Sequence, residues 1–173
     1  ACRQHLQQTA CALDDPRLNL IVGDGVAFVA NSQETFDVII VDSTDPVGMA
    51  APLFGESFYQ NVNRILSSDG IVVAQAESPY FHPEQQKAVL SRMANIFARV
   101  HLYNYYNLTY PGNTWGFAFA TKGLCPIQNL DLRRVEQSGL EMQYYTTAMH
   151  RAAFALPAFQ QRALAECLSP LTL

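Results

Sequence analysis

The sequence predicts an α/β fold in which a mainly parallel sheet carries helices on both faces. Four runs of apolar and β-branched residues have the length of strands and lie at residues 18–22, 37–41, 70–74 and 115–120. Stretches with the apolar spacing of helices separate these runs. The runs at 37–41 and 70–74 are almost continuously apolar, as expected for strands buried on both faces of a sheet. Alternation of strands and helices favours parallel pairing.

The amino-terminal part of the chain begins in helical sequence. Residues 1–13 have the pattern of a helix already in progress, with neither a Met nor a capping residue at its start. We therefore expect further chain before Ala1. The strand at 18–22 follows, and residues 25–31 could form a short helix.

Two longer helices follow the central strands. Residues 56–66 place Phe58 and Val62 near one face. Residues 83–97 open with Pro83 and Glu84, which suit a first helical turn, and carry a stripe of apolar side chains.

The carboxyl-terminal third has a weaker pattern. An aromatic-rich run at 100–106 is a candidate fifth strand. After the strand at 115–120, residues 130–138 and 156–166 have helical character, with a Tyr-rich link between them.

The composition bounds the class of protein. The 173 residues suit one domain, and the 49% of hydrophobic residues favours a packed core. The net charge is −4 and no basic run is present, which argues against a nucleic-acid partner. No apolar stretch is longer than a strand and no signal peptide is evident, so we expect a cytoplasmic protein without a membrane partner.

The cysteines do not indicate a metal site. Cys2, Cys11, Cys125 and Cys167 form no C-x-x-C pair, and no cluster of histidines accompanies them. We expect free thiols in a reducing compartment and no bound metal.

Polar segments follow three of the predicted strands, at residues 24–25, 42–46 and 75–77. Ligands of open α/β sheets bind at the carboxyl ends of the strands, so these segments should meet at one edge. Their acidic and amide side chains belong to Asp24, Asp42, Asp45, Gln75 and Glu77. Such a carboxylate-rich cleft suits a cation. Aspartates after strands also cap helices and close turns, which is the purely structural alternative.

The segment at residues 36–48, F-D-V-I-I-V-D-S-T-D-P-V-G, resembles the signature of spermidine synthases. Further matches to that family are D-D-P-R at 14–17, V-G-D-G at 22–25, L-F at 53–54, T-Y-P at 109–111, Y-Y at 144–145 and H-R-A-A-F-A-L-P at 150–157. These motifs follow the order of the family.

The resemblance implies a class I methyltransferase-like Rossmann core that is incomplete at its amino-terminal side, with residues 1–173 as the carboxyl-terminal portion of the catalytic domain. It also implies transfer of an aminopropyl group from decarboxylated S-adenosylmethionine to putrescine or a related diamine. The products would be spermidine and 5′-methylthioadenosine. The donor would be a co-substrate, so no cofactor is implied. We expect a homodimer or a higher homo-oligomer.

The resemblance also implies roles for particular residues. Asp42 would be the catalytic acid/base residue. The acceptor diamine would be held by Asp45, Gln75 and Tyr110. The donor would contact Asp24, Gly25, Pro46 and Leu53. These roles agree with the chemistry, because a protonated amine cannot attack until a base such as a carboxylate accepts its proton.

Two loops depart from the family pattern. Met49-Ala50-Ala51-Pro52 replaces a Gly-Pro-Ala-Glu-Ser type of loop, and Asn107-Leu108 stands where Ile-Pro is common. Both loops border the acceptor pocket of the family, so the identity of the amine stays open. Two other functions also stay open. One is a small-molecule methyltransferase in which residues 42–46 replace an Asn/Asp-Pro-Pro motif, and the other is a non-catalytic remnant of the fold.

Overall fold

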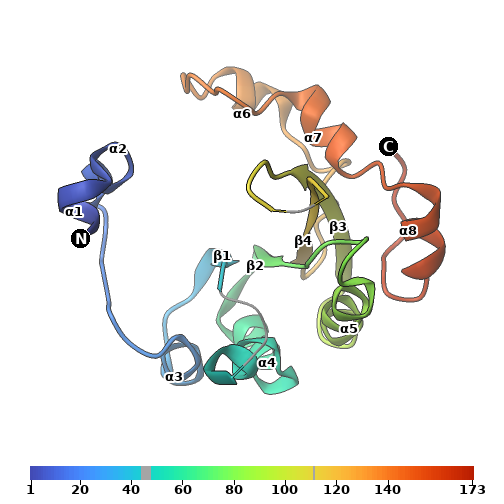
Figure 1. Ribbon diagram of the computed structural model, residues 1–173, viewed down its shortest axis with the longest axis horizontal. Helices are drawn as coiled ribbons and strands as arrows, with labels where there is room; N and C mark the ends of the chain where they lie inside the picture. The colour runs from blue at the N-terminus through green and yellow to red at the C-terminus, as the bar shows by residue number, and fades with distance from the viewer. Residues whose placement is uncertain (44–47, 111) are drawn as a thin grey trace.

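A computed structural model describes residues 1–43, 48–110 and 112–173. The helices are α1 (Cys2–His5), α2 (Gln7–Ala10), α3 (Gly25–Asn31), α4 (Glu56–Ile65), α5 (Pro83–Ala94), α6 (Leu132–Glu136), α7 (Thr147–Ala153) and α8 (Ala158–Ala163), with 3-10 turns η1 (Cys11–Asp14) and η2 (Gly48–Phe54). The strands are β1 (Phe36–Val41), β2 (Leu66–Gln75), β3 (Arg99–Tyr106) and β4 (Thr114–Thr121) (Figure 1).

The four strands form one sheet in the order β1-β2-β4-β3. Strands β1 and β2 are parallel, whereas β4 is antiparallel to both β2 and β3. Strands β1, β2 and β3 therefore run in the same direction and β4 runs against them, so the described sheet is mixed but mainly parallel, as predicted. The short connection at residues 107–113 explains why β4 runs against β3, because only antiparallel neighbours can be joined without a long crossover. The α/β alternation itself is confirmed from β1 to β3.

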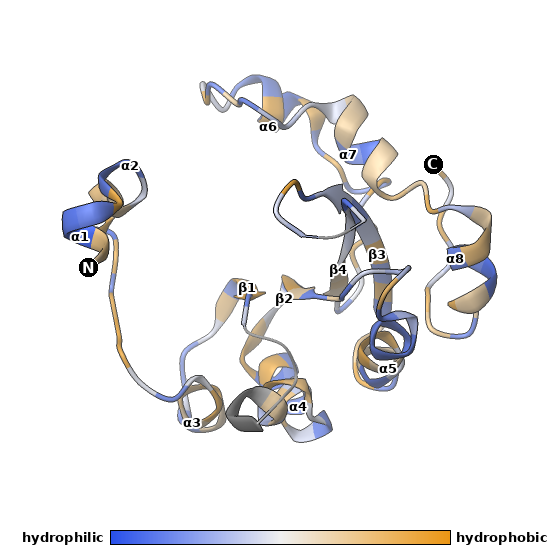
Figure 2. Cartoon of the chain, viewed as in Figure 1, coloured by the Kyte–Doolittle hydropathy of each residue, from blue (hydrophilic) through white to orange (hydrophobic). Residues whose placement is uncertain are grey.

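The predicted strand at residues 18–22 is wrong. These residues pair with no strand in the described parts of the chain, and Leu20 and Val22 are 57% and 95% exposed. Figure 1 shows them in the extended connection between α2 and α3, clear of the sheet, and Figure 2 colours much of that connection as hydrophobic. An apolar run becomes a strand only where a neighbouring strand accepts its backbone hydrogen bonds.

The helices follow the sequence pattern closely in the middle of the chain. Helix α3 has the bounds that we predicted, and α4 ends one residue earlier than expected. Toward both ends the helices are shorter or interrupted, since residues 1–13 divide into α1, α2 and η1. Helix α7 was not predicted. Its start is fixed by Thr146, whose hydroxyl accepts a hydrogen bond from the backbone nitrogen of Met149 at 3.0 Å.

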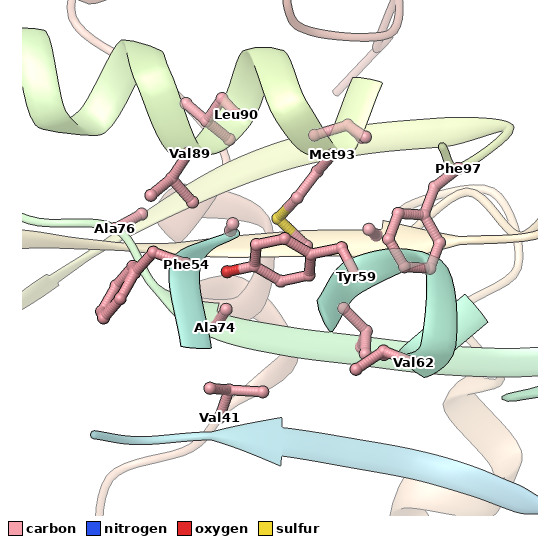
Figure 3. Close-up of a cluster of buried hydrophobic side chains, with 14 of the residues drawn as sticks. Val41, Phe54, Tyr59, Val62, Ala74, Ala76, Val89, Leu90, Met93 and Phe97 are labelled. Atoms are coloured by element: carbon pink, nitrogen blue, oxygen red, sulfur yellow. The ribbon is translucent and has the colours of Figure 1, made fainter. Parts of the chain in front are cut away.

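The main core lies between the sheet and helices α4 and α5. Tyr59 and Val62 of α4 and Leu90 and Met93 of α5 are fully buried in one cluster with side chains of β2, β3 and β4. Figure 3 shows Tyr59 among these side chains, between the rings of Phe54 and Phe97. Truncating one such aliphatic side chain to Ala typically costs about 2–5 kcal/mol of folding free energy. This packing holds the carboxyl ends of β1 and β2 in place.

Candidate active site

The carboxyl ends of β1 and β2 form one edge of the sheet. Val41 pairs with Ala74 across these parallel strands, so Asp42, which follows β1, lies next to Gln75, the last residue of β2. A cavity of about 900 Å³ opens there. Its walls come from the ends of β1 and β2, the segment before α5, and strands β3 and β4. The residues that line it are Asp42, Ser43, Gln75, Glu77, Phe81, His82, Tyr105, Tyr110, Trp115, Gly116 and Phe117.

The cavity is acidic. Asp42 and Glu77 each bring a carboxylate to its wall, and no Lys or Arg is among the lining residues that the structure describes. Asp42 is exposed, whereas Glu77 is buried. Two carboxylates in the wall favour a cationic ligand over an anionic one.

Glu77 has an unusual backbone conformation. Its φ is +58°, a left-handed region that non-glycine residues rarely adopt. The backbone nitrogen of Gly116 donates to the carbonyl oxygen of Glu77 at 2.9 Å, and the nitrogen of Ala76 donates to the carbonyl oxygen of Gly116 at 2.9 Å. Pairing with β4 thus continues beyond Gln75 before the chain turns at Glu77. The sequence placed Glu77 at this edge but gave no sign of its left-handed conformation.

Aromatic side chains form the opposite wall. The rings of Tyr110 and Trp115 lie 4.9 Å apart, and those of Tyr105 and Phe117 are stacked at 4.7 Å. Trp115 and Tyr105, from the predicted strands at 115–120 and 100–106, both line the cavity. Aromatic faces attract ammonium groups, so this wall complements the carboxylates.

The loop between β3 and β4 approaches this wall through a glycine. Gly112 has a φ of +77°, and a Cβ atom placed on it would lie 2.6 Å from the ring of Phe81. A larger residue would be strained in its backbone and would also displace Phe81 from the cavity. Gly112 therefore allows the loop to approach the cavity closely.

A second cavity of about 410 Å³ lies on the other side of Asp42. It shares Asp42 and Ser43 with the larger cavity, and its remaining lining is apolar apart from the backbone of Gly25. Leu53 lies in its wall. Asp42 is therefore positioned where two cavities of different character meet.

Asp24 acts as the cap of helix α3. Its Oδ1 accepts hydrogen bonds from the backbone nitrogens of Val26 at 2.8 Å and Ala27 at 3.3 Å. This cap places Gly25 at the helix start, where it lines the smaller cavity. Asp24 itself lines neither cavity.

The structure thus gathers most of the predicted site residues in two groups. Asp42, Gln75 and Tyr110 meet in the larger cavity. Gly25 and Leu53 meet Asp42 in the smaller one. The predictions for Asp45 and Pro46 concern residues outside the described parts of the chain.

Within residues 1–43, 48–110 and 112–173, no three His, Cys, Asp or Glu side chains form a group that could hold a metal ion. None of the helices described there is both long and apolar enough to span a bilayer.

The fold and the site together define an α/β protein of the Rossmann-like methyltransferase class, with an acidic, aromatic-lined cavity at the carboxyl edge of its sheet. Residues 1–130 match the family described as the spermine/spermidine synthase domain. The chain belongs to this family.

Relatives and solved structures agree with this assignment. The chain is 42% identical over 161 residues to the polyamine aminopropyltransferase of Caldicellulosiruptor bescii, which covers 93% of this chain and 57% of the relative. It is 38% identical over 165 residues to that of Thermotoga maritima, covering 95% of this chain and 56% of the relative. A spermidine synthase solved in complex with the transition-state analogue AdoDATO superposes with a TM-score of 0.91 at 37% identity, over 96% of this chain and 57% of that chain. The chain thus spans little more than half the length of these proteins.

Proposed function

We propose that this chain is part of an aminopropyltransferase that moves an aminopropyl group from decarboxylated S-adenosylmethionine to putrescine or a related diamine. Spermidine and 5′-methylthioadenosine would be the products. In this proposal, residues 1–173 are the carboxyl-terminal portion of the catalytic domain. The observation that carries the proposal is the position of Asp42 at the meeting point of two cavities. A group transfer between two small molecules needs such a shared point.

The larger cavity supports the acceptor half of the proposal. A diamine is a dication near neutral pH, because the pKa of a primary amine lies near 10. The carboxylates of Asp42 and Glu77 and the aromatic wall suit such a ligand. Gln75 and Tyr110 would orient the amine by hydrogen bonds, and the matched motif assigns the distal ammonium to Asp45.

The smaller cavity supports the donor half. Its apolar lining suits the nucleoside part of the donor, with Gly25 and Leu53 in contact with the ligand. The matched motifs add Asp24 and Pro46 to this donor side. Helix α3, whose start Asp24 caps, would support the position of Gly25.

The proposed reaction is a nucleophilic substitution at carbon. Asp42 accepts a proton from the acceptor ammonium, which frees the lone pair of its nitrogen. That nitrogen forms a bond to the aminopropyl carbon next to the sulfonium. The carbon–sulfur bond breaks at the same time, and its electron pair stays on sulfur to give a neutral thioether. Positive sulfur is already a good leaving group, so alignment of the two substrates would supply much of the rate acceleration.

Product analysis tests this function. Two forms of the protein would be incubated with decarboxylated S-adenosylmethionine and putrescine. One is the chain alone. The other is a fusion of the chain to the amino-terminal segment of the Caldicellulosiruptor relative, which the chain does not match. Formation of 5′-methylthioadenosine and spermidine in equal amounts is expected. Formation of S-adenosylhomocysteine from S-adenosylmethionine instead would support a methyltransferase.

A binding measurement separates both enzymes from a non-catalytic remnant. Calorimetry with putrescine and with 5′-methylthioadenosine should give micromolar dissociation constants for an aminopropyltransferase. Absence of binding by both the chain and the fusion would contradict the proposal. A cytoplasmic location and a homodimer or higher homo-oligomer are also part of the proposal, and light scattering on the fusion tests the oligomeric state.

A further inference from the structure

A series of three side-chain amides connects helix α8 to the wall of the larger cavity. Gln86 of α5 and Gln160 of α8 are each 2% exposed, and Asn104 lies on β3. Asn104 donates from Nδ2 to Oε1 of Gln160 at 2.7 Å, and Gln160 donates from Nε2 to Oε1 of Gln86 at 3.1 Å. Gln86 then donates from Nε2 to two backbone carbonyl oxygens, those of Ala76 at 2.8 Å and Glu77 at 3.2 Å.

Only one assignment of donors and acceptors satisfies the hydrogen bonds of this series. Backbone carbonyls only accept hydrogen bonds, so Gln86 must turn its NH₂ group toward Ala76 and Glu77. Its oxygen then faces Gln160, which must also present its NH₂ group. Both hydrogens of the Gln86 amide are used in this way. The buried amide is therefore fixed in one orientation against the segment that ends β2.

That segment is strained, and Gln86 contacts it at the point of strain. Glu77 holds a φ of +58°, which a non-glycine residue keeps only where its surroundings fix the backbone. Its carbonyl oxygen accepts from both Gly116 and Gln86. A Cβ atom on Gly116 would lie 3.0 Å from Nε2 of Gln86, so the glycine leaves the space that the amide occupies.

We propose that Gln86 is a positioning residue for the diamine side of the cavity. It does not line the cavity. By holding the carbonyls of Ala76 and Glu77, it keeps the backbone of Glu77 left-handed and directs the side chains of Gln75 and Glu77 to the cavity wall. The expected effect on diamine binding rests on the proposed function, whereas the expected effect on the backbone of Glu77 does not.

The first test is the substitution Gln86→Leu, which keeps the approximate volume and removes both donors. We expect the crystal structure of this variant to show Glu77 outside the left-handed region. The dissociation constant for putrescine should rise at least tenfold, while that for 5′-methylthioadenosine should change less than twofold. Gln85 is the matched control, because it precedes Gln86 on the same helix and is exposed. Gln85→Leu should leave the backbone and both dissociation constants as in the wild type.

A second variant separates positioning from a general loss of stability. In Gln86→Leu the amide of Gln160 keeps Oδ1 of Asn104 as an acceptor at 3.3 Å but loses Oε1 of Gln86, which should lower the melting temperature. Adding Gln160→Leu removes the N–H that lost its acceptor, and Asn104, which then loses its partner, is half-buried and can bond to water, so the melting temperature should recover at least in part. Putrescine binding should stay weak in the double variant, because the donors to Ala76 and Glu77 are still missing.

Two results would overturn the inference. One is a left-handed Glu77 in the structure of the Gln86→Leu variant. The other is recovery of putrescine binding together with stability in the double variant, which would reduce Gln86 to a packing role. If the wild-type chain and the fusion bind no putrescine, the proposed function fails, and the conformation of Glu77 still decides whether Gln86 fixes this backbone.

Discussion

Val41 of β1 and Ala74 of β2 are paired neighbours in the parallel part of the sheet. This pairing brings Asp42 and Gln75 to one edge, although thirty-odd residues separate them in the sequence. The sheet residues at this edge belong to the hydrophobic core, with Ala74 and Ala76 almost fully buried. A rigid core below and an open acidic cavity above is the arrangement expected of a site that must orient two substrates.

The substitution Asp42→Asn should lower turnover by about 100-fold or more, because an amide cannot accept the proton of the acceptor ammonium. The fold should survive, since Asp42 is exposed and surface changes usually alter stability by less than about 0.5 kcal/mol. Release of 5′-methylthioadenosine by the fusion and thermal melting measure the two effects. Asp69→Asn is the control, because Asp69 is also exposed and lies outside both cavities. Near-normal turnover of Asp42→Asn would remove Asp42 as the base.

The substitution Gly112→Ala should lower the free energy of unfolding by about 1–2 kcal/mol, because an L-residue is strained at a φ of +77°. The new methyl group would also press on Phe81, so putrescine binding should weaken. Urea unfolding and calorimetry measure these changes. Gly123→Ala is the matched control, since Gly123 has open space at its Cβ position. Equal effects of the two substitutions would show that the conformation of Gly112 is unimportant.

The substitution Tyr59→Phe should keep the free energy of unfolding unchanged or raise it by up to about 1 kcal/mol. The hydroxyl of Tyr59 is buried and has no hydrogen-bond partner among the described residues, so its removal relieves an unpaired polar group. Urea unfolding at pH 7 measures the change. Tyr144→Phe serves as an exposed reference. A loss of more than 1 kcal/mol in Tyr59→Phe would point to an important partner of the hydroxyl.

Tyr59 should also contribute to alkaline unfolding. Burial raises the pKa of Tyr59 to about 12, although the positive charge of Arg92 opposes the shift. The unfolded chain loses this proton near pH 10, so the stability contribution is complete below pH 10 and declines as the pH rises toward 12. The Tyr59→Phe variant should therefore lose less stability than the wild type over this range. Urea titrations at pH 9, 10 and 11 measure the free energy of unfolding. An identical decline of this free energy with pH in the variant and the wild type would contradict the prediction.

His101 should make the protein sensitive to acid. Burial lowers the pKa of His101 to about 4, and Arg99 lowers it further. The unfolded chain takes up a proton near pH 6.5 and the folded chain only near pH 4, so stability should decline as the pH falls from 6.5 to 4. The substitution His101→Leu should flatten this decline, whereas His5→Leu, at an exposed position, should not. Urea titrations at pH 7, 5.5 and 4.5 measure the free energy of unfolding. An equal decline with falling pH in the wild type and both variants would exclude His101 as the cause of the acid sensitivity.

The sequence by itself determined the elements whose signal is local. Strands β1 and β2 and helices α3, α4 and α5 follow from the spacing of apolar residues, because that spacing already defines which face each element can bury. The positions of Asp42 and Gln75 were predictable for the same reason, since Asp42 directly follows β1 and Gln75 is the last residue of β2. The family motifs then suggested a different role for each residue.

Only the tertiary structure decided the features that depend on distant partners. Residues 18–22 have the composition of a strand but no described strand beside them, and composition alone cannot supply a partner. The position of Trp115 in the cavity wall depends on the register of β4, and the left-handed Glu77 depends on contacts from Gln86 and Gly116. The link from Gln86 to Gln160 spans 74 residues. Sequence patterns record which side chains avoid water, whereas the pairing of buried polar groups is settled only when remote segments pack together.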